Sequence, residues 1–179
     1  MTTSTKLECA CGHLALEVTG EPILNAECCC NSCRTAAAKL RALPRAAPFP
    51  EPGLGTRFVL YRKDRVSFVQ GVDMLKEFRL GPDATTRRVL ATCCNTPVFL
   101  EFEKGHWLSL YGCLWPADKL PPLEMRTMTS DLPAGTVLPA DVPNGARQPL
   151  TFMLKLLGAW MAMFFRSPEI TVVNGVIHV

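Results

Sequence analysis

The stretch CCCNSCRTAAAKL, residues 28–40, holds four cysteines within its first six positions and then becomes a run of helix-forming residues. Cys28, Cys30 and Cys33 have the spacing C-x-C-x-x-C, and its C-x-x-C half is typical of a turn that brings two sulfurs to one zinc ion. Asn31 or Ser32 is a suitable N-cap for the helix that follows. Because the N-terminus of a helix carries partial positive charge, it favours thiolate over thiol.

Three sulfurs in this arrangement suit one tetrahedral ion with an open fourth position, which is typical of catalytic rather than structural zinc. Three thiolates overcompensate the charge of Zn²⁺, so the ion is a weak Lewis acid toward water and prefers another soft sulfur as its fourth ligand. A substrate thiol bound there has its pKa lowered below the usual value of about 8.5. We therefore predict thiol activation at Cys28, Cys30 and Cys33, and a packing role for Cys29.

The composition favours a folded protein that keeps its cysteines reduced. Hydrophobic residues make up 48% of the chain, so a core can form. No apolar run follows Lys6, so we expect no signal peptide, a cytoplasmic location and reduced thiols. With nine cysteines, metal binding is then favoured over disulfides or inert buried thiols. The net charge of +3 is dispersed along the chain, and we expect no nucleic-acid partner.

Short alternating segments predict a mainly β fold of antiparallel strands. They are separated by Gly, Pro, Asp or Lys at intervals typical of that architecture, and they cover residues 13–18, 57–61, 65–70, 75–80, 87–92, 97–103 and 106–111. One helix interrupts them after the cysteine turn, and the proline-rich residues 43–56 predict a loop. We place a zinc-binding β domain at residues 6–115, with residues 116–179 packed on it.

The C-terminal third predicts three further features. Residues 116–149 are rich in proline and read as an extended arm that crosses the surface. The apolar stretch 149–165 is shorter than the ~20 residues that span a bilayer, and it predicts a helix. That helix is expected to be buried against the sheet or to form a homodimer through residues 150–165, and membrane contact is not expected. Asn174-Gly175 lies between β-branched residues, which predicts a terminal hairpin.

A second group of cysteines is separated widely in the sequence. Cys9 and Cys11 are two positions apart, and Cys93 and Cys94 are adjacent. Folding could join the two pairs into a structural metal site, whose fourth ligand the residues alone leave open.

Taken in order, these motifs resemble the glutathione-dependent formaldehyde-activating enzyme / centromere protein V family. C-x-C-G stands near the start, C-x-C-x-x-C-R follows about twenty residues later, and a cysteine followed by NTP precedes a strand. The resemblance covers about residues 6–115. It implies a β-tent fold with a catalytic zinc on Cys28, Cys30 and Cys33 and a structural zinc on Cys9, Cys11 and a later C-x-x-C. It also implies a carbon–sulfur lyase that acts on an S-hydroxymethyl adduct of glutathione.

The chain departs from the family at the later motif. Where the family has C-x-x-C-G-[ST], this chain reads ATCCNT, residues 91–96. Cys94 matches the second cysteine, while Ala91 replaces the first. Cys93 is one candidate for the missing ligand, although neighbours in a strand point to opposite faces. The other candidates are His13, His106 and Cys113, and loss of the second metal is a further alternative.

Three arginines are weighed as substrate ligands. Arg34 follows the cysteine turn and is predicted to bind a substrate carboxylate, with a solvated arginine as the alternative. Arg87 and Arg88 lie on opposite faces of one strand, so at most one faces the site, and surface salt bridges are the alternative for both.

Taken together, these features predict a zinc-dependent carbon–sulfur lyase-type protein that acts on a small thiol adduct. The alternatives are a non-catalytic zinc-binding module whose C-terminal helix binds a second copy or a partner, and a redox switch through Cys29, Cys93 and Cys94.

Overall fold

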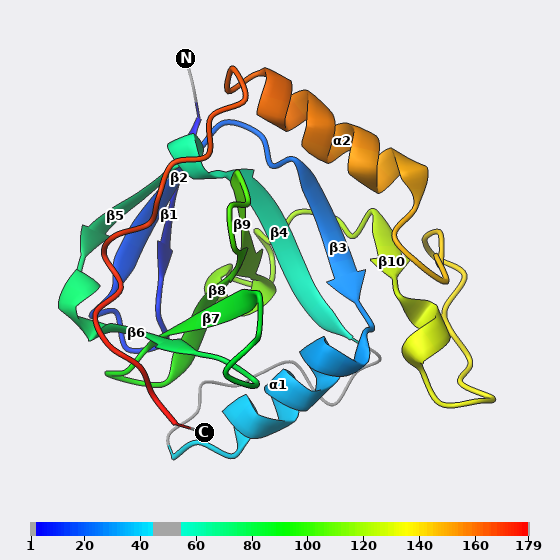
Figure 1. Ribbon diagram of the computed structural model, residues 1–179, viewed down its shortest axis with the longest axis horizontal. Helices are drawn as coiled ribbons and strands as arrows, with labels where there is room; N and C mark the ends of the chain where they lie inside the picture. The colour runs from blue at the N-terminus through cyan, green and yellow to red at the C-terminus, as the bar shows by residue number, and fades with distance from the viewer. Residues whose placement is uncertain (1–2, 45–54, 179) are drawn as a thin grey trace.

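The computed structural model describes residues 3–44 and 55–178, and within them the chain forms two β-sheets and two α-helices (Figure 1). The predicted mainly β fold is confirmed. The strands are β1 (Ser4–Glu8), β2 (Ala15–Thr19), β3 (Leu24–Cys28), β4 (Thr56–Arg62), β5 (Val66–Gln70), β6 (Leu75–Phe78), β7 (Thr86–Ala91), β8 (Thr96–Phe102), β9 (Trp107–Tyr111) and β10 (Met125–Thr127). The helices are α1 (Asn31–Arg41) and α2 (Leu150–Met161). Most of the predicted loop at 43–56 lies outside the described residues.

The strands form a small sheet and a large one. The described three-stranded sheet has the order β1-β2-β5, and the seven-stranded sheet has the order β10-β3-β4-β9-β8-β7-β6. The pairs are antiparallel except at one edge, where β10 runs parallel to β3. Residues 28–40 lie beside this edge, because β3 ends at Cys28 and leads into α1.

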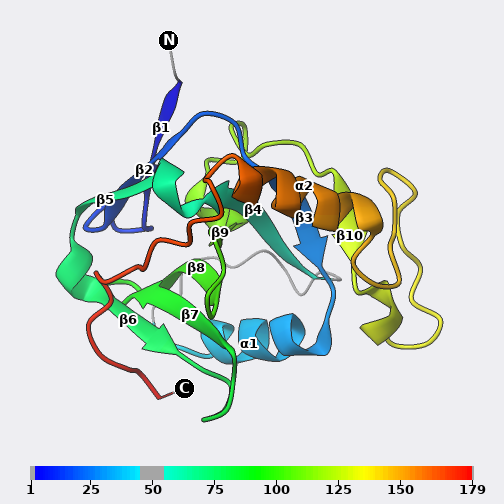
Figure 2. The ribbon, with the colours of Figure 1, turned by 45° about the horizontal axis from the view of Figure 1, so that its top comes forward.

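The two faces of the seven-stranded sheet pack against different partners. One face shares a core with the three-stranded sheet, and its buried residues include Val59, Val89, Phe99 and Leu110. The other face shares a core with the two helices, through residues such as Leu60, Leu90, Leu100 and Leu156. Figures 1 and 2 place α1 and α2 at opposite ends of this second face, with β3 and β4 between them. The sheet thus separates two apolar layers.

Helix α1 is amphipathic and begins at the cysteine turn. Its buried residues are Cys33, Ala36, Ala37 and Leu40, the i, i+3, i+4 and i+7 spacing of a single helix face. Cys30 is the N-cap, where Asn31 or Ser32 was predicted, and its sulfur accepts a hydrogen bond from the backbone N–H of Cys33 at 3.3 Å. The cap therefore fixes one candidate metal ligand relative to another.

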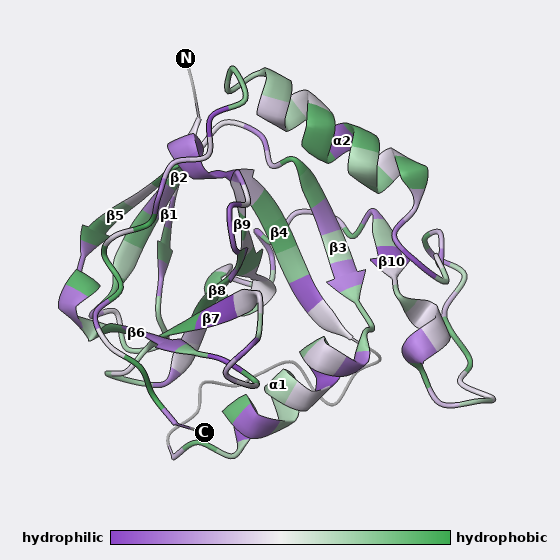
Figure 3. Cartoon of the chain, in the orientation of Figure 1, coloured by the Kyte–Doolittle hydropathy of each residue, from purple (hydrophilic) through white to green (hydrophobic). Residues whose placement is uncertain are grey.

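Helix α2 is held along one edge and leaves much of its apolar surface exposed. Leu156 is the buried residue within the helix, and its carbonyl oxygen lies 2.9 Å from Nε2 of His106. The ring of His106 stacks on Trp160, with centroids 5.6 Å apart, and Lys155 pairs with Glu124. Figure 3 shows the apolar character of the helix along most of its length. No helix in the described part of the chain has the length and apolar character to cross a membrane.

The arm between β9 and α2 is anchored to the edge of the large sheet. Met125 is buried, and Arg126 forms ion pairs with Glu27 at 2.8 Å and with Asp141 at 2.7 Å. The hydrogen bonds from Arg126 lower the pKa of Asp141. The arm therefore supplies strand β10, which the sequence pattern did not predict.

The predicted hairpin at the C-terminal end is wrong. Residues 174–177 instead lie along β6: the N–H of Asn174 donates to the carbonyl of Leu75 at 2.9 Å, and the N–H of Ile177 donates to that of Glu77 at 2.8 Å. The contact between Glu77 and Val176 is a parallel bridge. The reason is that β6 is an edge strand with unpaired backbone N–H and C=O groups. Residues 174–177 therefore form hydrogen bonds with β6 rather than with the residues before them.

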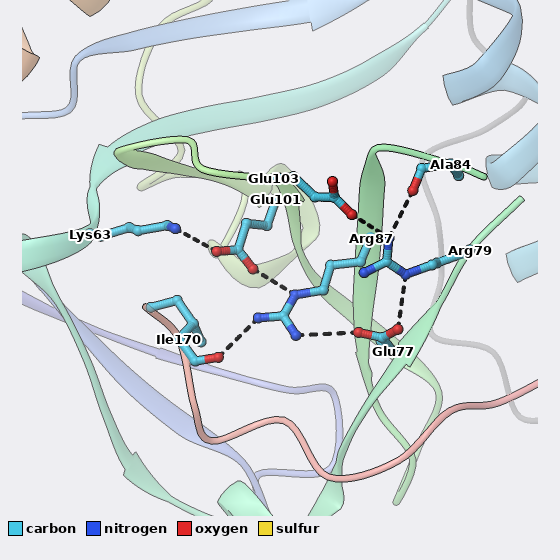
Figure 4. Close-up of polar contacts among 8 residues, drawn as sticks. All are labelled: Lys63, Glu77, Arg79, Ala84, Arg87, Glu101, Glu103 and Ile170. Atoms are coloured by element: carbon cyan, nitrogen blue, oxygen red, sulfur yellow. Dashed lines mark hydrogen bonds and ion pairs between the residues drawn. The ribbon is translucent and has the colours of Figure 1, made fainter. Parts of the chain in front are cut away.

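A network of charged side chains connects the C-terminal segment, at Ile170, to the large sheet (Figure 4). Arg87 lies between Glu101, at 2.6 Å, and Glu77, at 3.2 Å, and its Nη2 donates to the carbonyl oxygen of Ile170. Lys63 completes the network with an ion pair of 2.5 Å to Glu101, and both side chains are almost fully buried. Arg87 thus has a structural role on the face that packs against the small sheet.

Candidate metal centres and the adjoining cavity

The sulfurs of Cys28, Cys30 and Cys33 lie within 4.8 Å of one another. Cys28 ends β3, Cys30 caps α1, and Cys33 lies in the first helical turn. Within the described residues no fourth histidine, cysteine or carboxylate joins this group. The group can therefore hold a metal ion through three sulfurs, and we call it the three-thiol cluster.

The three thiols share hydrogen bonds that stabilise a negative charge on one sulfur. Hydrogen bonds from Cys28 and Cys33 lower the pKa of Cys30 far below its usual value. The same hydrogen bonds raise the pKa of Cys28 and, together with burial, that of Cys33. Cys30 is thus the sulfur that carries the charge when the cluster is free of metal. The backbone of Cys29 bonds to the arm instead, and its side chain is fully buried outside the cluster.

The second group of cysteines comes together as a set of four, which we call the four-thiol cluster. Cys9 lies 3.6 Å from Cys11 and 3.7 Å from Cys93, Cys11 lies 3.5 Å from Cys93, and Cys93 lies 3.9 Å from Cys94, all between sulfur atoms. Zn–S bonds of about 2.3 Å in a tetrahedron place sulfurs about 3.8 Å apart. The measured separations fit a closed four-sulfur metal site.

Adjacent cysteines can both reach this cluster because they lie in a turn rather than in a strand. Strand β7 ends at Ala91, and the N–H of Cys94 donates to the carbonyl of Ala91 at 3.3 Å. Asn95 has φ 54°, a left-handed conformation that asparagine tolerates. Cys93 therefore takes the place that Ala91 vacates. Among the described residues, His13, His106 and Cys113 do not belong to the cluster, and His106 instead binds the backbone of α2.

The three-thiol cluster opens onto a cavity of about 360 Å³. Apolar side chains form most of its wall: Phe58, Leu60, Leu100, Phe102, Trp107, Phe152, Met153 and Leu156. Three of these residues come from α2, so the C-terminal third of the chain completes the cavity. Ser32, Arg88, Ser109 and Gln148 are among its polar residues. The four-thiol cluster does not line this cavity.

The predicted substrate ligand Arg34 lies outside the residues that line the cavity. Its Nη1 donates to the carbonyl oxygen of Asp131 at 3.0 Å, which ties α1 to the arm. Its role toward a substrate stays a prediction. Arg88 is the arginine that does line the cavity, and sequence reasoning placed it only on the face opposite to Arg87. The available signal was its position two residues before Leu90, which places the two side chains on the same strand face.

Comparisons with known proteins agree with the cysteine motifs. Residues 4–48 match the family of the glutathione-dependent formaldehyde-activating enzyme. A crystal structure of a Rhodobacter sphaeroides protein from structural genomics is similar, with 16% identity and a TM-score of 0.46, and it covers 78% of this chain and 99% of its own. No curated protein matches the sequence. The matched segment contains Cys9, Cys11 and the three-thiol cluster. Over residues 4–48 the chain therefore resembles the glutathione-dependent formaldehyde-activating enzyme family, as its motifs predicted.

Proposed function

We propose that this protein is a zinc-dependent carbon–sulfur lyase-type enzyme that acts on an adduct between a small thiol and an aldehyde. The observation that supports it most directly is the three-thiol cluster, which faces a cavity and has no fourth protein ligand among the described residues. Three sulfurs with an open position are the arrangement of a catalytic zinc site, since structural sites close with a fourth ligand.

Cys28, Cys30 and Cys33 would hold the zinc ion. When bound there, zinc would supply a soft fourth position that binds a thiol and favours its thiolate form at neutral pH. The surrounding side chains act on the rest of the substrate. Phe58, Leu60 and Trp107 shield the reacting groups from water, and the hydroxyl of Ser109 offers hydrogen bonds to the oxygen of the adduct.

The reaction itself is reversible addition of sulfur to a carbonyl carbon. In the direction of formation, the thiolate sulfur bonds to the aldehyde carbon and the carbonyl oxygen takes a proton. In the direction of cleavage, the hydroxyl loses its proton, the carbonyl double bond reforms and the sulfur leaves with the bonding electron pair. No electrons are gained or lost overall, so the reaction needs no redox partner.

The four-thiol cluster would hold a second, structural zinc ion. Its sulfur separations fit a tetrahedral site, and it lies away from the cavity residues. A closed set of four thiolates leaves no position for a substrate.

Zinc analysis combined with thiol binding tests this proposal. We expect purified protein to contain two zinc ions per chain. Added thiol should then bind to the loaded protein in calorimetry, and absorption at the zinc edge should report one further sulfur at one of the two ions. Fully loaded protein that binds no thiol would contradict the proposal, because the open position would then have no use.

A non-catalytic role with a dimerising helix is the second candidate, and the exposed surface of α2 favours it. Leu150 is 72% exposed, Leu154 is 55% exposed, and Phe164 just beyond the helix is 83% exposed. Large exposed apolar patches mark interaction sites. The helix carries one charged residue, Lys155, which already pairs with Glu124, so a second copy of the same apolar surface suits it better than an anionic lipid surface.

The oligomeric state tests this second candidate. We expect sedimentation of the native chain to show a dimer and the Leu154→Glu variant to be a monomer, because a carboxylate in the contact would have to be buried without a partner. The variant Val137→Glu, on an exposed residue of the arm, is the matched control. A native monomer at high protein concentration would count against dimerisation.

A further inference from the structure

Arg88 is buried in an apolar environment without a carboxylate partner. Its side chain is 1% exposed, and across the neighbouring strands it lies opposite Phe78 and Leu100. It takes part in none of the ion pairs that the described residues form. A buried charge without a partner is costly, and proteins usually provide one.

Arg87 and Arg126 show what such partners look like, whereas the partly buried Arg57 is bonded to neutral oxygens of Asn25 and Pro121. Arg87 pairs with Glu77 and Glu101, and Arg126 pairs with Glu27 and Asp141. Each guanidinium is thus matched by two carboxylates. Arg88 has no such carboxylate in the described chain, and its charge instead helps to lower the pKa of Cys30.

Two nitrogens of Arg88 also have no hydrogen-bond partner within the described residues. Nη2 donates to the carbonyl oxygen of Ser32 at 3.3 Å and to its hydroxyl at 3.0 Å, and the guanidinium also lies near the hydroxyl of Tyr111, while Nε and Nη1 are buried without a hydrogen-bond partner. Buried donors in native proteins are nearly always bonded, so an exception calls for an explanation. A ligand that accepts hydrogen bonds from the guanidinium supplies one.

The position of Arg88 connects it with the three-thiol cluster. Ser32, which it contacts, lies between Cys30 and Cys33, and Arg88 lines the same cavity as these two cysteines. A molecule in that cavity can therefore reach both the cluster and the guanidinium. The hydrogen bonds to Ser32 hold Nη2 in place, which orders the side chain before a ligand arrives.

We propose that Arg88 binds a carboxylate of the substrate, and that the substrate thiol is a small mercaptocarboxylic acid with one negative charge and an apolar skeleton. This inference rests on the proposed function and names the class of its thiol. A guanidinium binds carboxylates through charge-assisted hydrogen bonds, which are about twice as strong as neutral ones. The carboxylate also neutralises the buried charge.

The other residues that line the cavity explain why we expect a substrate with a single negative charge besides its thiol. Besides Arg88 and the cysteines, the described lining residues carry no ionisable side chain, and most of them are apolar. A thiol peptide with an ammonium group and a second carboxylate would bury these charges without partners, and each would lose its hydration without compensation. An apolar chain between sulfur and carboxylate would instead bury its methylenes favourably.

Balancing the negative charge of the thiolates is the competing role for Arg88. Such a role acts on the cluster itself, so it changes the binding of every thiol by the same factor. A carboxylate partner changes the binding of charged thiols only. The two roles therefore differ in selectivity rather than in affinity alone.

The experiment measures binding of straight-chain ω-mercaptocarboxylates of increasing length to the zinc-loaded protein by calorimetry. Each acid is paired with the ω-mercapto alcohol of the same length, and the matching alkanoates without sulfur form a third series. We expect the best acid to bind the native protein about 10- to 100-fold more tightly than its alcohol, from one charge-assisted bidentate contact. It should also bind more tightly than glutathione.

Two variants at Arg88 and one at Arg166 identify the source of that preference. In Arg88→Met the acid and the alcohol should bind within about threefold of each other, whereas Arg88→Lys should keep part of the preference because it keeps the charge. Arg166→Met is the matched control: it removes an exposed arginine that does not line the cavity, and it should keep the native preference.

Each other outcome is decisive. If Arg88→Met binds the acid and the alcohol more weakly by the same factor, the inference is overturned in favour of charge balance. It is also overturned if the native protein binds acid and alcohol equally well, and this result does not depend on whether the Arg88 variants fold. Tighter binding of glutathione than of any acid overturns the assigned class. Binding of alkanoates that depends on Arg88, with no thiol bound, overturns the proposed function and supports the carboxylate site. Failure of all three series overturns both.

Discussion

Replacing Cys30 with serine is expected to remove the metal from the three-thiol cluster and to lower the rate of adduct cleavage by more than about 100-fold. Loss of a residue that only orients a metal ligand lowers activity by up to about 100-fold, and loss of a ligand itself should lower it further. The physical reason is the loss of one of the three sulfurs that would hold the ion, which leaves fewer protein ligands than a catalytic zinc site has. The measurements are zinc content per chain and the rate of aldehyde release from a thiol adduct. Zinc should fall from two ions per chain to one.

This substitution separates chemistry from folding because serine is a preferred N-cap. Cys30 caps α1 by accepting a hydrogen bond from the N–H of Cys33, and a serine hydroxyl accepts the same bond. Circular dichroism should therefore report an unchanged fold. Cys29→Ala is the matched control, since it removes a neighbouring buried sulfur that lies outside the cluster. It should keep both zinc ions and the native rate.

Two results would contradict the catalytic assignment of this cluster. An unfolded Cys30→Ser protein would indicate that the metal holds the fold together, as expected of a non-catalytic module. A folded variant that has lost one zinc ion and still cleaves the adduct at the native rate would place the chemistry elsewhere.

The sequence was informative where chemistry and local structure coincide. The spacing of Cys28, Cys30 and Cys33 depends on one turn and one helix start, so a short stretch was enough to predict the cluster that the structure brings together. The alternating strands were predicted for the same reason, since alternation is a local property. Strand β10 was missed because its three residues form a strand only by pairing with β3, about a hundred positions earlier.

Long-range partners decided the features that sequence reasoning could not reach. Asn174-Gly175 has the local pattern of a hairpin, but residues 174–177 form hydrogen bonds with the edge strand β6 instead. Alternation along the strand places Arg88 and Arg87 on opposite faces, but it does not tell which of these faces adjoins the three-thiol cluster. The importance of Arg88 depends on Phe78 and Leu100 across the strands and on Ser32 from another element. These contacts exist only in the folded chain.

The four-thiol cluster shows the same limit at a pair of adjacent residues. Cys93 was an unfavourable candidate on the assumption that it continues a strand, in which neighbours point apart. The chain instead turns after Ala91, and both sulfurs reach the same site. The turn thus brings both adjacent cysteines into one group with Cys9 and Cys11.

Replacing Cys93 with serine is expected to release the zinc ion of the four-thiol cluster and to lower the melting temperature by about 10 °C. The cluster joins the turn after β1 to the turn after β7, which are more than eighty positions apart in the sequence. Metal binding is coupled to folding in such sites, so loss of the ion lowers the free energy of unfolding, here by about 3–5 kcal/mol. Each 1 kcal/mol shifts the melting temperature of a chain of this size by about 2–4 °C. Thermal unfolding followed by circular dichroism measures the shift.

Cys113→Ser is the matched control for this substitution, because Cys113 is also half-buried but lies outside the four-thiol cluster, with its sulfur hydrogen-bonded to the carbonyl oxygen of Pro97. It should melt within about 2 °C of the native protein, as a mutation away from a stabilising feature does. A chelator should lower the melting temperature of the native chain and have much less effect on Cys93→Ser, whose structural site is already lost. Thiol binding at the other cluster should persist in Cys93→Ser below its melting temperature, since the two sites lie apart. If Cys93→Ser instead keeps two zinc ions and the native melting temperature, the site closes without Cys93, and the turn after β7 does not have the role assigned to it.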